Sequence, residues 1–133
     1  MRRVLLLALG GAAALVVLAT CGESTQPVAG VLEVVLSSPN SGQDSAIMLT
    51  VTGPRGLTSA QAGTGLRMFS QPLGGMPSKF ALVGRLDGGA VLLTIGITDL
   101  SQSDQYHATI DQIALPSFQL RQYVGYYSLT LTK

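Results

Sequence analysis

Hydrolysis needs a nucleophile, a base and an acid close together in space. One short segment of this chain carries side chains of these types close together in sequence. His107 is the only histidine, and Thr109 and Asp111 follow it two and four residues later. Alternate side chains of an extended strand share a face, so all three are expected to point the same way. At ~3.3 Å per residue, however, the Cα atoms of His107 and Asp111 would lie about 13 Å apart. This distance excludes direct pairing unless the strand bends, so we expect His107 to be an exposed strand residue. The sequence also has no G-x-S-x-G motif, and we expect that the protein is not an enzyme.

Metal and phosphate chemistry have no clear set of ligands in this sequence. A zinc site needs several nitrogen or sulfur ligands, whereas His107 and Cys21 are each the only residue of their type. Oxygen ligands for calcium gather in 98–105 (TDLSQSDQ) and 39–44 (PNSGQD), but without the spacing of an EF-hand. Asp and Asn in such loops commonly cap turns, which is the interpretation we favour. The segment GTG (63–65) lacks the lysine of a phosphate-binding loop and predicts a turn. We therefore expect no metal and no cofactor.

Tyrosines and threonines remain as candidates for a ligand-binding face. Tyr127 alternates with the leucines of the last apolar run and is predicted to lie in the core, which leaves Tyr123 and Tyr126 as exposed rings. With His107 and Thr109 they form the possible ligand face. Aromatic rings stack on sugars while hydroxyl groups take hydrogen bonds. Threonine also favours strands for packing reasons alone, so both interpretations of the threonines stay open.

The first twenty residues have the layout of an export signal. Arg2 and Arg3 precede sixteen residues, 4–19, without a charged side chain. As a helix this run would reach about 24 Å, less than the roughly 30 Å hydrocarbon core of a bilayer, so a permanent membrane span is the weaker interpretation. Cleavage by a general signal peptidase, with Val17 and Ala19 as its small residues, is one alternative.

The other alternative is carried by Leu18, Ala19, Thr20 and Cys21. These residues resemble the lipobox of bacterial lipoproteins, whose cysteine is diacylated and becomes the first residue of the mature chain. Thr20 stands where Gly, Ala or Ser is usual. The resemblance implies a signal peptide over 1–20, a lipidated tether over 21–29 and a domain over 30–133. It also implies an exported protein that acyl chains hold in the bacterial cell envelope. Gly22 favours the outer over the inner membrane, because Asp is the common retention signal at that position.

Charge excludes one class of partner. The chain has 8 Lys and Arg against 7 Asp and Glu, and removal of Arg2 and Arg3 with the signal would leave 6 against 7, a net charge of −1. No basic stripe remains that would attract nucleic acid.

Hydrophobic alternation with a period of two runs through the rest of the chain and predicts strands. The Asp-Gly step in 86–89 (LDGG) predicts a hairpin between 80–85 and 90–98. Residues 58–62 could form a single helical turn, and no other helix is expected after residue 30. We predict an all-β fold, an antiparallel β-sandwich of seven to eight short strands, either immunoglobulin-like or of the jelly-roll or cohesin type. Six of the expected strands are identified by this alternation: 31–38, 46–53, 79–85, 90–98, 106–114 and 125–133.

The order of the segments GVLEVVL, SPN, AIMLTVTGP, GGAVLLTIGI and GYYSLTLT resembles small bacterial lipoproteins of unassigned function. More distantly it is similar to the cohesin-like and carbohydrate-binding sandwiches of exported bacterial proteins. Only 11% of the residues are charged, which disfavours catalysis. The leading expectation is therefore a non-enzymatic module that binds an envelope protein or serves as an accessory part of an envelope assembly. The alternative is a carbohydrate-binding module with a Thr/Tyr-rich face, and a hydrolase that uses His107 comes last.

Overall fold

The computed structural model describes residues 26–133. The predicted signal peptide, the lipobox residues Leu18, Ala19 and Thr20, and Cys21 lie outside the described residues, so their assignments stay predictions. Between residues 26 and 133, no helix has both the length and the apolar character needed to cross a membrane.

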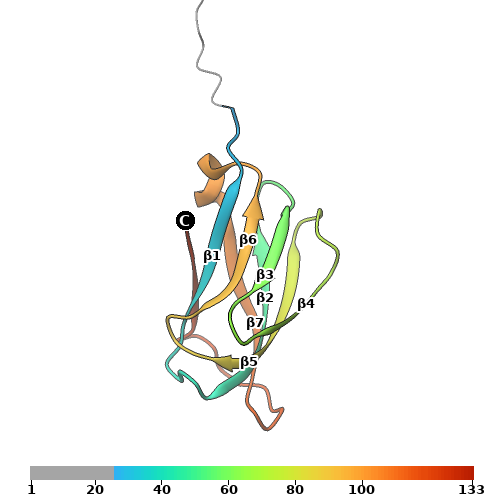
Figure 1. Cartoon of the computed structure of the whole chain (residues 1–133). Helices are drawn as coiled ribbons and strands as arrows, with labels where there is room; N and C mark the ends of the chain where they lie inside the picture. The colour runs from blue at the N-terminus through green and yellow to red at the C-terminus, as the bar shows by residue number, and fades with distance from the viewer. Residues whose placement is uncertain (1–25) are drawn as a thin grey trace, which may run out of the picture.

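Eight antiparallel strands form two four-stranded sheets that pack face to face, which confirms the predicted all-β sandwich (Figure 1). One sheet has the order β3-β6-β1-β8 and the other the order β4-β5-β2-β7. We call them the first and the second sheet. The strands are β1 (Gly30–Ser37), β2 (Asp44–Thr52), β3 (Ser59–Ala62), β4 (Arg67–Ser70), β5 (Ser78–Leu86), β6 (Val91–Ile97), β7 (His107–Ala114) and β8 (Ser128–Thr132).

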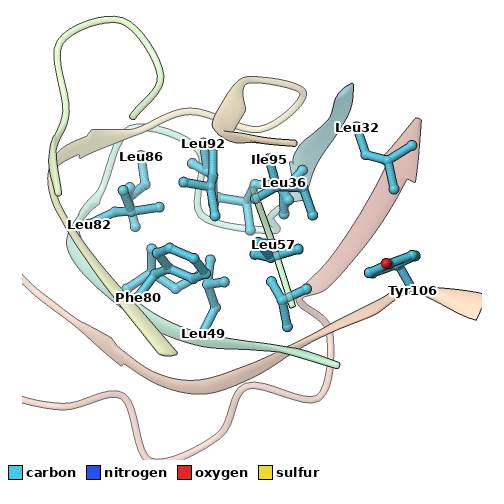
Figure 2. Packing of buried hydrophobic residues seen from close by; sticks show 14 of the residues in the cluster. Leu32, Leu36, Leu49, Leu57, Phe80, Leu82, Leu86, Leu92, Ile95 and Tyr106 are labelled. Atoms are coloured by element: carbon cyan, nitrogen blue, oxygen red, sulfur yellow. The ribbon is translucent and has the colours of Figure 1, made fainter. Parts of the chain in front are cut away.

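The apolar faces that the period of two predicts meet between the sheets (Figure 2). Side chains from both sheets are at most 1% exposed there, among them Leu32, Leu49, Phe80 and Ile95. Burial of each such side chain contributes roughly 1.5–3 kcal/mol relative to exposure. β6 departs from strict alternation because Val34 pairs with Leu93 while Val35 pairs with Val91, which leaves an extra residue, Leu92, in a bulge. The bulge lets Leu92 and Leu93 both be fully buried.

The predicted hairpin at 86–89 is wrong. β5 pairs with β2 and β4, whereas β6 pairs with β1 and β3, so the turn carries the chain from one sheet to the other. The Asp-Gly step does make a tight turn, in which the amide of Ala90 donates to the carbonyl of Asp87 and Gly89 has a φ of 81°. Gly89 then donates to the carbonyl of Leu36 in β1, and this pairing draws the chain into the first sheet.

Residues 58–62 are not a helical turn either, because 59–62 form β3 on the edge of the first sheet, paired with β6. The small and polar residues of this segment show no clear hydrophobic alternation. Its strand conformation comes from pairing with β6. A 3-10 helix, η1 (Leu100–Gln105), was not predicted, because the apolar periodicity of longer helices is missing from so short an element. The turn predicted at 63–65 is confirmed between β3 and β4, with a φ of 78° at Gly65.

Candidate functional site

His107 and Thr109 lie exposed on the outer face of the second sheet, as the alternation predicts. Asp111 also lies on this face but interacts with other groups. Its Oδ2 accepts a hydrogen bond from the hydroxyl of Thr50 at 2.6 Å and lies 3.7 Å from Nζ of Lys79. A register shift in the β2–β7 pairing leaves Asp111 as an extra residue between Ile110 and Gln112. Asp111 therefore interacts with Thr50 and Lys79. Among the described residues, no acidic side chain is hydrogen-bonded to His107.

A groove of about 300 Å³ runs between the edges of β7 and β8, beside His107. Tyr106, Ala108, Leu129 and Leu131 contribute to its walls. Tyr106 is buried and donates its hydroxyl to the carbonyl of Arg55 at 3.3 Å. Ser103, Asp104, His107 and Thr130 line the rest of the groove, so its surface is more polar than apolar. Ser103 and Asp104 thus share the groove with His107, but within residues 26–133 neither side chain is hydrogen-bonded to the imidazole.

The two loops considered for calcium have other roles. Asp99 caps η1, accepting from the amide of Ser101 at 3.0 Å and from its hydroxyl at 2.7 Å. These two bonds lower the pKa of Asp99 below its usual value. Across residues 26–133 no cluster of three or more His, Cys, Asp or Glu side chains could hold a metal ion.

Tyr123 and Tyr126 are exposed, with 68% and 77% of their surface accessible, and Tyr127 is buried, all as predicted. Both exposed rings belong to the loop 115–127 that connects β7 to β8. Their centroids lie 5.5 Å apart with an interplanar angle of 76°, an edge-to-face pair that provides no single flat platform. The loop follows the end of β7 opposite to His107, at the end of the sandwich away from the first residue of β1 (Figure 1). The structure thus does not bring His107 and Thr109 together with the tyrosines.

A buried polar cluster, which no local sequence pattern indicates, holds the base of this loop. Asp44, whose side chain is fully buried, accepts from the hydroxyl of Tyr127 at 2.7 Å and from Nε of Arg121. Asn40 donates from its amide to the Tyr127 oxygen at 2.8 Å. Because the partners of Asp44 lie 77 and 83 residues away in sequence, no local motif could have revealed the cluster.

Titration within this cluster follows from burial and from the charge of Asp44. Burial, and then the hydrogen bond to Asp44, raises the pKa of the Tyr127 hydroxyl above its ordinary value. The same carboxylate raises the pKa of Arg121 by accepting its hydrogen bond. Both raised pKa values mean that the protonated forms, neutral Tyr127 and charged Arg121, are favoured in the fold.

Apolar side chains gather on the outer face of the second sheet, at the half nearer the loop 115–127. Four of them are exposed by 41–56%: Phe69, Val83, Met48 and Leu120. We call these four residues, with Ala46 and Ala81 between them, the apolar patch. Ala81 pairs with both Phe69 and Met48, and Ala46 pairs with both Val83 and Ala114, which is bridged to Leu120, so the patch crosses the whole sheet.

Two shallow hollows, of about 120 and 260 Å³, lie within the patch and share Met48 and Ala81 in their linings. Basic and polar groups surround it. The guanidinium of Arg67 lies 5.8 Å from the centre of the Phe69 ring, and Lys79 contributes to the lining of the larger hollow. The outer face is therefore apolar in one half and polar in the other, where Thr50, Thr109 and His107 lie. The alternation contains one signal for the patch. Met48 lies on the same face of its strand as Thr50 and Thr52, so it is a large apolar side chain on a face that was expected to be polar.

The chain was compared with protein-family models, with curated proteins and with solved structures, and none of them matches it.

Proposed function

We propose that this protein is an exported, lipid-anchored module of the bacterial cell envelope that binds a partner protein without catalysis. The anchor would be acyl chains on Cys21, and the docking surface would be the apolar patch. The main observation in favour of this docking surface is that four large apolar side chains are exposed side by side on one sheet face. Contiguous exposed apolar surface with a polar rim is typical of a protein interaction site.

The arrangement of the rim supports a protein partner. Arg67 packs on Phe69 and so holds a charged group beside an apolar ring. Lys79 is tied to Thr50 and Asp111 at the border of the polar half. An apolar centre excludes water while peripheral polar groups fix orientation, a division common in protein interfaces.

The distribution of titratable groups supports a non-catalytic role. His107 and the exposed tyrosines lie at opposite ends of the sandwich, and the Asp111 carboxylate is bonded to Thr50. The carbohydrate alternative stays a prediction, in which a sugar would stack on Tyr123 or on Tyr126 separately, because the two rings meet edge to face.

Site-specific photo-crosslinking in intact bacterial cells tests the docking surface. Benzoylphenylalanine replaces Phe69, and in a matched control it replaces the exposed Thr132 on β8 of the other sheet. We expect one discrete protein adduct at position 69 and none at 132. Met48→Gln should remove that adduct without changing the melting temperature, because Met48 is 44% exposed. Equal adducts at both positions, or an adduct that Met48→Gln leaves unchanged, would contradict docking through the patch.

A further inference from the structure

The loop 115–127 begins with a tight turn whose backbone is strained at one residue. The amide of Phe118 donates to the carbonyl of Leu115, and the amide of Leu115 donates to the carbonyl of Gln119, each at 2.9 Å. Phe118 has a φ of 65° and is the only residue other than glycine with a positive φ between 26 and 133. This left-handed conformation is uncommon for a bulky side chain, and Gly or Asn would adopt it at less cost.

Packing of the Phe118 ring within the fold does not offset the free energy of this strained conformation. It is 93% exposed, the highest value among the exposed large apolar residues of the described chain. Strain that folding does not require points to a role outside the fold. The turn therefore presents one exposed aromatic ring to the surroundings.

The same loop carries three other exposed side chains that are apolar or amphipathic. Leu120 is 53% exposed, and Tyr123 and Tyr126 expose most of their rings. Only one residue between 115 and 127 is charged, Arg121, and it is held by the buried Asp44. The end of the loop thus has no charged group available for an ion pair.

We propose that this loop inserts Phe118 into the surface layer of a lipid bilayer, with the two tyrosines at the level of the headgroups. This inference rests on the proposed lipid anchor, which would already hold the protein beside a membrane. A projecting apolar side chain needs no complementary cavity in a fluid bilayer, whereas docking on a rigid protein would require one. Phe and Leu favour the acyl boundary, and Tyr favours the interface because its ring is apolar and its hydroxyl polar.

The tether is long enough for this contact even though the loop lies at the far end of the domain. Nine residues, 21–29, reach at most about 30 Å when extended. The eight residues of β1 span about 26 Å. The domain can therefore lie along the membrane with its loop end touching the surface. A second, weak membrane contact is effective there because the anchor keeps the loop at a high local concentration.

Photo-crosslinking of the full chain in bacterial cells tests the proposal. Benzoylphenylalanine replaces Phe118, an exchange of one exposed aromatic ring for another, and the adduct is analysed by mass spectrometry. We expect phospholipid adducts at position 118 and none at Thr132. In vesicles of phosphatidylethanolamine and phosphatidylglycerol, the adduct yield should be the same at low and high salt, because apolar insertion is not screened.

Each other result overturns membrane insertion. A protein adduct at 118 would assign the loop to a partner protein, and no adduct would show that it faces water. A yield that falls steeply with salt would indicate charge attraction instead. Docking of a partner protein is judged separately, from the adduct at Phe69, so membrane insertion and docking can each fail while the other stands. Loss of the Cys21 anchor would remove the basis of both proposals.

Discussion

The hydroxyl of Tyr127 lies 2.7 Å from Oδ2 of Asp44, although the two residues are 83 positions apart in the chain. Tyr127 stands directly before β8 and Asp44 opens β2, so this hydrogen bond joins the two sheets at one end of the sandwich. Arg121 on the same carboxylate fixes the loop between β7 and β8. The loop that carries the exposed rings is therefore anchored to the core at its base.

Tyr127→Phe removes only the hydroxyl group of this contact. Asp44 then keeps Arg121 but loses one partner, and hydrogen bonds to charged groups contribute about 1.5–3 kcal/mol. We expect the free energy of unfolding, measured by urea titration, to fall by about 2 kcal/mol. The dependence of this free energy on urea concentration should not change. A change within experimental error would show that water replaces the hydroxyl, and the cluster would then not determine the stability of this end.

The raised pKa of Tyr127 makes stability depend on alkaline pH. The native state holds the proton more tightly than the unfolded chain, in which tyrosine titrates near pH 10. The contribution is fully present below about pH 10 and is lost as the pH rises through the native pKa. We expect the free energy of unfolding to decline more steeply above pH 10 in the wild type than in Tyr127→Phe. Parallel curves for the two proteins would contradict the shift.

Arg121→Ala should destabilise far more than the loss of an exposed arginine. The Arg121 side chain is 20% exposed and its partner Asp44 is fully buried, so the variant leaves a buried carboxylate without its cation. We expect a loss of about 3 kcal/mol and faster hydrogen exchange of the amides of Leu115 and Phe118. Arg85→Ala is the matched control, because the Arg85–Asp87 pair is exposed and should contribute less than about 0.5 kcal/mol. Equal effects of the two variants would refute the assigned role of Arg121.

Phe118→Asn should stabilise the fold. The left-handed conformation costs most residues roughly 1–2 kcal/mol, and Asn adopts it readily. Because the ring is 93% exposed, its removal loses little packing, and we expect a gain of about 1 kcal/mol in chemical unfolding. Phe118→Val, with a β-branched side chain at the same φ, should lower stability. A loss of stability in Phe118→Asn would mean that the ring packs in the fold and that its backbone conformation carries no strain.

The sequence predicted what depends on local alternation. Apolar residues at every second position identified the core faces of β1, β2 and β5, and the same pattern separated buried Tyr127 from exposed Tyr126. The pairing of strands is a property of the whole chain, so the 86–89 turn predicted a hairpin where the chain in fact crosses between sheets. The contacts of Asp44 and the strain at Phe118 were unpredictable for the same reason. Distant residues or backbone angles create them, and no short motif encodes either.

Both proposals depend on the lipid anchor at Cys21, and the mass of the mature N-terminus tests it most directly. The protein is expressed as the full chain in bacteria, isolated from the membrane fraction and digested, and its N-terminal peptide is analysed by mass spectrometry. We predict a chain that begins at Cys21 and carries the added mass of a diacylglyceryl group. A chain that keeps residues 1–20, or one that starts at Thr20 or at an unmodified Cys21, would contradict the account.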